Sequence, residues 1–471
     1  MRLLYDEGTL LIRDPPADLQ PPACFAWDAR VDAWRARAHH YRAAVEALRS
    51  RGVSLTDGVP RYSRLNLSLR SQPDPHPHQR EAFDAWTDRG CRGVVVLPTG
   101  AGKSHVALMA LAHVRRSALV VSPTIDLMNQ WYDLLTKAFE MEVGILGGGY
   151  HDVRDLTVTT YDSAYMHADR YGNAFGLVVF DEVHHLPGEV YSHAAEMAVA
   201  PYRLGLTATP ERADGRHVLL EDLVGPLVYA RGIRDLSGEY LADYTTERME
   251  VSMVAEERAV YDAAYGEYRE FLEAHRLSVG TADGWKKFVM LSARSSAGRR
   301  AMLAYQRYRR VALGTAAKLR VLEDLLKRHP RDRALIFTND NETAYAISQT
   351  FLIPAITHQT RTRERKAILE AFNRGDYLAV VTSKVLNEGV NIPEANVAVV
   401  LSGSGSIREH VQRLGRILRR REGKQAVLYE VVSKNTVEDR ISRRRRRHEA
   451  YDGDQAPGLG RQRPAKVREQ R

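Results

Sequence analysis

The sequence predicts an α/β protein with two parallel sheets in tandem, an N-terminal α+β module and a helical insertion. Apolar strand candidates alternate with helical segments from about residue 78 to 230, and such alternation is typical of a parallel sheet covered by helices. A charged, helical stretch follows from about 255 to 310. The alternation then restarts near residue 334, and the 471-residue chain is long enough for about three domains.

The first 70 residues form a module of their own. Apolar residues 3–5 and 10–12 flank a glycine turn, which predicts a β-hairpin. One apolar stripe within residues 31–51 predicts a helix that ends at Gly52, and its members are Trp34, Ala38, Tyr41, Val45 and Leu48. The Pro/His-rich segment 73–77 then reads as a linker to the next domain.

Two further domains are expected at 71–230 and 316–450, separated by a linker and the helical insertion at 231–315. The strands expected in the first are 94–97, 118–122, 156–160, 177–180 and 204–207. Those expected in the second are 334–338, 355–358, 378–383, 397–402 and 426–432. The basic chain from about Arg443, including the tail 451–471, is expected to be disordered.

Composition narrows the function. The net charge of +9 and the pI of about 9.4 favour a polyanionic partner such as nucleic acid, although a merely basic protein has the same balance. Cys24 and Cys91 match no metal spacing, the 17 histidines show no zinc-ligand pattern, and the expected location is the reducing cytoplasm. The sequence has no apolar run of membrane-spanning length and no signal-peptide core, so no membrane association is expected.

The segment Leu97-Pro98-Thr99-Gly100-Ala101-Gly102-Lys103-Ser104 carries the strongest chemical signal. It follows an apolar strand and precedes a helix, so its glycines and the helix N-terminus can surround phosphate oxygens. Lys103 is expected to reach the β- and γ-phosphates and Ser104 to bind Mg²⁺. The alternative is an accidental loop, because the strict motif has glycine where this chain has Leu97.

A second signal is Asp181-Glu182, which directly follows the apolar strand 177–180. Asp181 is placed to hold Mg²⁺ and Glu182 to orient the attacking water, the alternative being a solvated acidic loop. Thr207 and Thr209 end the last strand of the same domain, where their hydroxyls could link the nucleotide site to the next domain.

In the second domain, Arg416 and Arg419 lie at i and i+3 on an expected helix. This spacing puts both guanidinium groups on one face, as arginine fingers for the γ-phosphate require. A solvated basic helix is the alternative. The polar loop before it holds Glu388 and Gly389, which we expect near the nucleotide.

The order T-G-x-G-K-S, D-E-x-H, T-A-T, E-G-x-N-x-P and Q-R-x-G-R-x-x-R resembles the motif series of superfamily 2 helicases, and XPB-type DNA helicases in their compact archaeal and bacterial form most closely. The resemblance implies two RecA-like domains that bind ATP and Mg²⁺ between them. It also implies that the N-terminal module is similar to that branch's damage-recognition domain and the helical insertion to its thumb.

The resemblance assigns further roles. It implies that Gln79 recognises adenine, that His184 contacts the second domain and that Gln412 lies near the γ-phosphate. Strand phosphates are expected at Ser122, Thr124 and Thr160. The chain departs from the family at the Arg-Glu-Asp motif that the resemblance links to DNA unwinding, which reads Arg212-Ala213-Asp214 here, and at Asn391, where many helicases have Asp.

The function implied is an ATP-dependent DNA helicase or translocase with 3′-to-5′ polarity, acting in nucleotide excision repair as a monomer, with a nuclease as an expected partner. Alternatives are a double-strand translocase that does not unwind, an RNA helicase and a scaffold with an inactive nucleotide site. Two features stay open: the arginine run 443–447 could bind DNA or be solvated. The aromatic stripe Tyr261, Tyr265, Tyr268 and Phe271 could be helix core or a base-stacking platform.

Overall fold

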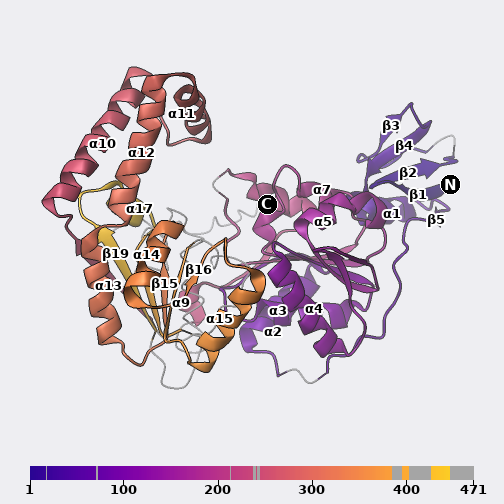
Figure 1. Ribbon diagram of the computed structural model, residues 1–471. Coiled ribbons are helices and arrows are strands. Elements are labelled where there is room, and N and C mark those ends of the chain that lie inside the picture. The colour runs from indigo at the N-terminus through magenta and orange to yellow at the C-terminus, as the bar shows by residue number, and fades with distance from the viewer. Residues whose placement is uncertain are drawn as a thin grey trace, which may run out of the picture. The chain divides into compact units, whose positions relative to one another are not determined.

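The computed structural model describes residues 1–16, 19–70, 73–212, 214–236, 240, 244–383, 395–402 and 426–445 (Figure 1). They divide into two compact units. The first is built mainly from Met1–Tyr244 and Leu326–Ala398, and the second from Thr245–Leu325 and most of the described residues after Ala398. No helix among the described residues is both long and apolar enough to cross a membrane.

The N-terminal module is a five-stranded sheet in the order β3-β4-β2-β1-β5 with one helix beside it. The predicted hairpin is confirmed, since β1 pairs antiparallel with β2. The bounds are β1 Arg2–Asp6, β2 Thr9–Arg13, β3 Ala26–Asp28, β4 Ala33–Arg37, η1 Ala38–His40, α1 Tyr41–Ser50 and β5 Thr56–Asp57.

The helix predicted over 31–51 is wrong in its first half. Residues 33–37 form β4, which pairs antiparallel with β2 from Ile12↔Trp34 to Thr9↔Arg37. The free edge of β2 captures this segment, and a tertiary contact of this kind overrides helical spacing in the sequence. The helix starts only at Tyr41, and its buried face carries Tyr41, Val45 and Leu48 from the predicted stripe.

The next domain holds an eight-stranded sheet in the order β13-β6-β12-β11-β7-β10-β8-β9. All five predicted strands are confirmed and pair in parallel: β6 Arg92–Val96, β7 Ala118–Ser122, β10 Leu156–Thr160, β11 Leu177–Asp181 and β12 Tyr202–Thr207. The hairpin β8 Gly144–Gly147 and β9 Tyr150–Asp152, and the strand β13 Leu227–Ala230, were not predicted. Short strands at a sheet edge give little apolar signal.

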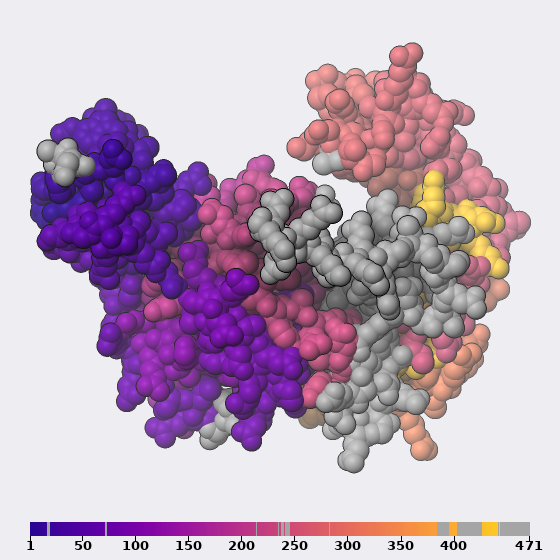
Figure 2. Space-filling view, turned by 180° about the vertical axis from the view of Figure 1, so that it is seen from behind, coloured from indigo at the N-terminus to yellow at the C-terminus, as the bar shows by residue number. Residues whose placement is uncertain are grey.

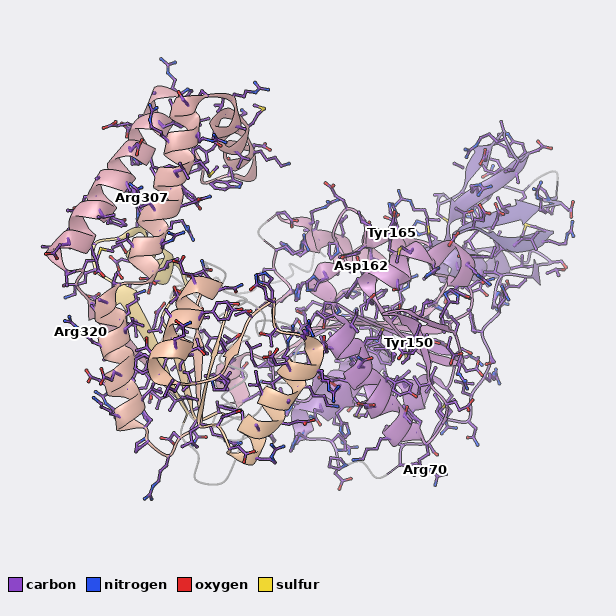
Figure 3. The ribbon with its side chains drawn as sticks, viewed as in Figure 1. Arg70, Tyr150, Asp162, Tyr165, Arg307 and Arg320 are labelled. Carbon is purple, nitrogen blue, oxygen red and sulfur yellow. The ribbon has the colours of Figure 1, made fainter. Side chains whose placement is uncertain are left out.

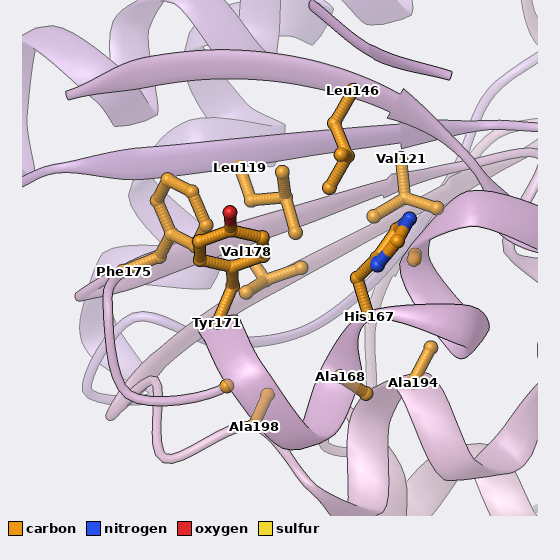
Figure 4. Close-up of a pocket in the computed structure, with 12 residues that line it drawn as sticks. Leu119, Val121, Leu146, His167, Ala168, Tyr171, Phe175, Val178, Ala194 and Ala198 are labelled. Carbon is orange, nitrogen blue, oxygen red and sulfur yellow. The ribbon is translucent and has the colours of Figure 1, made fainter. Parts of the chain in front are cut away.

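Helices cover this sheet, as the alternating pattern predicts (Figure 1). They are α2 Pro77–Asp88, α3 Lys103–Val114, α4 Ile125–Phe139, α5 Tyr161–Met166, α6 Ala168–Tyr171, α7 Ser192–Glu196 and α8 Leu220–Leu223, with the 3₁₀ turns η2 Val183–His185 and η3 Arg216–Leu219. The short helix α9 Ile233–Leu236 follows β13 in the chain. A cavity of about 20 Å³ remains beside the sheet, lined by aliphatic side chains with His167, Tyr171 and Phe175 (Figure 4). It is barely large enough for one water molecule, so the packing is close to complete.

The first unit also contains the parallel strands β15 Ala334–Phe337, β16 Ala355–Ile356 and β17 Ala379–Thr382 in the order β15-β17-β16. The helices α14 Asn341–Phe351 and α15 Thr362–Arg374 alternate with them. The restart of the α/β pattern near residue 334 is therefore confirmed.

The second unit combines strands with a helical insertion. Its strands are β14 Tyr244–Val251, β19 Ala426–Ser433 and β18 Val397–Val400, in that order, and its helices are α10 Ala255–Ala274, α11 Ala282–Arg294, α12 Ser296–Leu313, α13 Ala316–Arg328 and α17 Val437–Arg445. Because α17 extends to Arg445, the disorder expected from Arg443 is wrong for its first residues. The rest of the tail and of the arginine run lies outside the described residues.

The aromatic stripe of the insertion forms core. Tyr261, Tyr268 and Phe271 are buried on α10 and pack against Phe288 of α11 and Tyr308 of α12. Among these rings, edge-to-face and tilted contacts dominate, as aromatic cores prefer. The base-stacking alternative has no support from these three rings.

Candidate active site

Three strand ends bring the predicted catalytic residues of the first domain together. The strands β6, β12 and β11 are neighbours, with Thr207 opposite Val96 and Asp181 opposite Leu206. Since all three are parallel, the segments that follow them meet at one edge of the sheet. Ligands of open α/β sheets bind outside this carboxyl edge.

The phosphate loop after β6 has the backbone that its glycines predict. Gly100 and Gly102 have φ of 91° and 79°, in the left-handed region, and Gly102 is the N-cap of α3. A Cβ on Gly102 would lie 2.1 Å from Gln79 Nε2, so a side chain there would also collide with its neighbour. Lys103 Nζ donates to the carbonyl of Leu97 at 3.2 Å, across the loop in which phosphate is expected.

The side chain of Gln79, on α2, is hydrogen-bonded to this loop. Its Nε2 donates to the carbonyl of Ala101 at 3.0 Å, and its Oε1 accepts from the backbone N–H of His76 at 3.0 Å. His78 Nε2 lies 2.8 Å from the same carbonyl. Sequence reasoning did not assign His78 to the site, because nothing in the spacing of the two segments shows that they meet.

Asp181 ends β11 and is 8% exposed. Its Oδ2 accepts from Trp131 Nε1 at 2.9 Å and its Oδ1 from the backbone N–H of Glu182 at 3.0 Å. Burial, and next the charge of Glu182, raise the pKa of Asp181 to about 6, while Trp131 and Lys103 oppose the shift. Because burial and Glu182 disfavour the ionised form of this carboxylate, a nearby cation would stabilise it. Trp131, on α4, was missed because it lies 50 residues before its partner.

The site fits a nucleotide and its magnesium ion. Glu182 has a φ of 47°, an unusual backbone for a non-glycine residue that is typical of functional positions. Within the part of the chain that the structure describes, two buried oxygens of the site have no hydrogen-bond partner, Thr99 Oγ1 and Glu182 Oε2. The hydroxyl of Ser104 and the carboxylate of Asp181 are oxygen ligands of the kind that Mg²⁺ prefers.

A chain of hydrogen bonds begins at His184, whose Nδ1 lies 3.5 Å from Glu182 Oε2. The buried His184 places Nδ1 3.0 Å from Thr207 Oγ1, which donates to the carbonyl of Thr209 at 3.1 Å. The carbonyl of His184 accepts from Arg212 at 2.7 Å. The Arg212 guanidinium binds both carboxylate oxygens of Asp214, at 2.9 and 2.6 Å, and holds the pKa of that carboxyl well below its usual range. Hydrogen bonds thus link five of the residues predicted for coupling and DNA contact, namely His184, Thr207, Thr209, Arg212 and Asp214.

The hydroxyls expected to grip strand phosphates are used inside the protein. Ser122 Oγ is buried and donates to the carbonyls of Thr124 and Thr159. Thr124 caps α4 and Thr160 caps α5 through their side chains. Their contact with DNA stays a prediction.

The second-domain candidates lie outside the described residues. They are Glu388, Gly389, Asn391, Gln412, Arg416 and Arg419, and Ala213 of the first domain is likewise outside. Their roles stay predictions.

Family models match three parts of the chain. The xeroderma pigmentosum group B helicase damage recognition domain matches residues 3–59, the res subunit of type III restriction enzymes matches 72–212, and the helicase conserved C-terminal domain matches 317–421.

Curated relatives agree with these models. The chain is 40% identical over 444 residues to "DNA 3'-5' translocase XPB2" of Sulfurisphaera tokodaii, covering 94% of this chain and 99% of that protein. It is 31% identical to "DNA 3'-5' helicase XPB" of Mycobacterium tuberculosis, over 80% of this chain and 64% of that one. A subunit of Saccharomyces cerevisiae, "General transcription and DNA repair factor IIH helicase/translocase subunit XPB/SSL2", is 26% identical over 81% of this chain and 44% of its own length.

Proposed function

Because the chain belongs to the XPB family of superfamily 2 helicases, we propose that it is an ATP-driven motor that moves along DNA in the 3′-to-5′ direction. The observation that carries the proposal is the meeting of Lys103, Asp181 and Glu182 at the carboxyl edge of one sheet. A binding scaffold with an inactive site would not need these three groups together. Membership of the family supports DNA, rather than RNA, as the track.

Each group of the first domain has one task in this proposal. Lys103 and the amides of the phosphate loop bind the β- and γ-phosphates, and Gln79 contacts adenine. Mg²⁺, held by Ser104 and Asp181, would supply charge neutralisation on the phosphates. Glu182 orients the attacking water. Gln412, Arg416 and Arg419 are proposed to meet the γ-phosphate from the second domain, with Glu388 and Gly389 near the nucleotide.

The hydrogen-bond chain from His184 to Thr209 supports coupling of hydrolysis to movement. Loss of the γ-phosphate would alter the surroundings of Glu182. The Oε2 atom of Glu182 lies 3.5 Å from Nδ1 of His184. His184 in turn bonds Thr207, at the end of the central strand β12. A change at the phosphate therefore has a direct path to the segments that we expect to contact DNA.

The altered Arg212-Ala213-Asp214 motif bears on strand separation and not on ATP hydrolysis. The Arg212–Asp214 pair is intact, but alanine stands between them where relatives have glutamate. The departure favours movement along a duplex without strand separation as the second candidate function.

Two assays run side by side test the proposal. ATPase activity is measured without nucleic acid and with single-stranded DNA, duplex, forked duplex and RNA, and strand displacement is followed on the fork. We expect DNA to stimulate hydrolysis more than RNA does. Stimulation without displacement would assign the translocase. Equal or greater stimulation by RNA would contradict the DNA assignment.

The cellular role is proposed on the names of the relatives. We propose a role in nucleotide excision repair, supported by the repair factor named for the yeast relative. A nuclease partner, a monomeric state and a cytoplasmic location complete the proposal. Affinity copurification and light scattering test the first two, and fractionation tests the third.

A further inference from the structure

The N-terminal module lies against the first helicase domain (Figures 1 and 2), and hydrogen bonds join the two. The Tyr5 hydroxyl donates to the carbonyl of Ala168 at 2.9 Å. Arg42 donates to the carbonyl of Gly90 at 2.6 Å, and Asn173 Nδ2 donates to the carbonyl of Val59 at 3.0 Å. One further contact in this interface brings together two histidines and a carboxylate, which are potential metal ligands.

Two histidines of the module meet a carboxylate of the helicase domain there. His39 and His40, in η1, and Asp222, in α8, place one potential ligand atom each within 4.8 Å of one another. His39 is 4% exposed, and its ring lies 3.9 Å from that of His40 between centroids. The Asp222 side chain is 62% exposed, so one side of the cluster is open to water.

A neutral His39 ring has one N–H too few for the two oxygen atoms that its nitrogens face. Its Nδ1 lies 3.3 Å from the carbonyl oxygen of Glu196, and its Nε2 lies 3.2 Å from Asp222 Oδ2. Both partners are acceptors here, whereas a neutral imidazole carries a single N–H. One nitrogen lone pair therefore faces an oxygen, and a cation between them, either a second proton or a metal ion, would relieve this repulsion.

Geometry distinguishes the two, because a proton would satisfy His39 alone, whereas a metal ion would also engage His40, whose potential ligand atom lies within 4.8 Å of the others. Burial, followed by the charges of Arg203 and His40, lowers the pKa of His39 to about 4, against the opposing effect of Asp222. The His40 pKa is lowered too, mainly by burial. The direction of both shifts favours neutral imidazole, which is the form that binds metals.

Nearby arginines are held by other acceptors. Arg37 pairs with the Glu196 carboxylate at 3.0 Å. Arg92 donates to the backbone carbonyls of Asp222 and Val224. The buried Arg203 donates to four backbone carbonyls, those of Ala195, Ala198, Ala200 and Leu223. None of the three guanidinium groups is placed between His39 and Asp222 by these bonds.

We propose that His39 Nε2, a ring nitrogen of His40 and the Asp222 carboxylate bind one divalent transition-metal ion of the zinc class. Two ligands of a tetrahedral zinc ion with bonds of about 2.0–2.1 Å lie about 3.3 Å apart, close to the observed 3.2 Å. The His39 Nδ1–H then donates to the Glu196 carbonyl, an arrangement that orients most metal-bound histidines. A water molecule on the open side completes the shell.

The ion would join the N-terminal module to the helicase domain independently of ATP. Its ligands come from positions 39, 40 and 222, so no local spacing in the sequence shows the site. The test uses the untagged full-length chain, stripped with a chelator in nucleotide-free and Mg²⁺-free buffer. It is titrated with Co²⁺ and followed by visible d–d absorption, and its zinc content after Zn²⁺ loading is measured by mass spectrometry.

We expect one ion per chain and a tetrahedral Co²⁺ spectrum. Asp222→Asn and His40→Gln should each weaken binding by more than about 100-fold, beyond the 10- to 100-fold that loss of an outer-shell partner brings. The matched control is His151→Gln, an exposed histidine that lies beside Tyr171 and His167 but in no group of three potential metal ligands among the described residues. The proposal would be overturned if the wild type held no stoichiometric ion, or if both ligand variants bound the ion as tightly as the wild type does. Normal circular dichroism of each variant shows that it is folded.

Discussion

At the scale of single residues, burial, hydrogen bonds and backbone conformation set the properties of the charged groups in the nucleotide site. Asp181 is buried and held by Trp131, and Glu182 occupies an unusual backbone conformation. Lys103 reaches back across its own loop to Leu97. A lysine in that position is available to phosphate oxygens as soon as these replace the carbonyl.

Lys103→Ala should abolish ATP hydrolysis and leave DNA binding largely unchanged. The substitution removes the charge that holds the β- and γ-phosphates, whereas strand contacts are expected elsewhere. Turnover is measured by phosphate release, and binding by fluorescence anisotropy on the same preparation. Wild-type turnover in the variant would refute the assignment of the phosphate loop.

Glu182→Gln should bind ATP and fail to cleave it. The amide keeps the size of the side chain but no longer activates the attacking water. Filter binding of labelled ATP, followed by analysis of the bound nucleotide, is expected to show ATP rather than ADP. Unimpaired hydrolysis would argue against the role of Glu182.

At the scale of secondary-structure elements, a buried ion pair joins α13 to α17. Lys318 Nζ lies 2.7 and 2.6 Å from the two carboxylate oxygens of Glu438, and both side chains are almost fully buried. Glu438 also accepts from the backbone N–H of Ser433 at 2.9 Å. Removing one partner leaves the other charge buried, which is far more costly than removing both.

Lys318→Met should therefore destabilise the second unit by about 3–5 kcal/mol. Hydrogen exchange of α13 and α17 measures the loss locally, as protection that falls by about 100-fold or more. The double variant Lys318→Met/Glu438→Gln is the control, because its neutral amide can still accept from Ser433. Exchange as fast in the double variant as in the single one would show that packing, and not charge, is the cause.

Elements also show where the sequence misleads. Residues 33–37 carry apolar side chains at helical spacing but pair with β2 as a strand, because a free sheet edge lies beside them. The strands β6, β7 and β11 were found correctly, since they are buried and continuously apolar. The short edge hairpin of β8 and β9 was not found.

At the scale of the whole molecule, we expect charge to drive the interaction with DNA, because the net charge is +9. The helix α12 carries five arginines and no acidic residue, and Arg307 projects from it in Figure 3. Its other face packs into the aromatic core of the insertion. We therefore expect α12 to contact backbone phosphates with little sequence preference.

Arg307→Gln should weaken DNA binding equally for unrelated sequences and lower the slope of log affinity against log salt by about 0.7–0.9. Anisotropy titrations at several salt concentrations measure both quantities. The control is Arg2→Gln, which removes an exposed arginine that already pairs with Asp14 at 2.8 Å. A slope unchanged in Arg307→Gln, or reduced as much in the control, would exclude a phosphate contact at Arg307.

The sequence alone determined the two α/β patterns, the phosphate loop, the Asp181-Glu182 pair and the family, because each is written in consecutive residues or in strictly ordered motifs. Only the tertiary structure placed Trp131 on Asp181, His78 on the phosphate loop and His39 opposite Asp222. These partners lie between 23 and 183 positions apart in the chain. Sheet order and domain packing, not local spacing, decide which of such distant side chains meet.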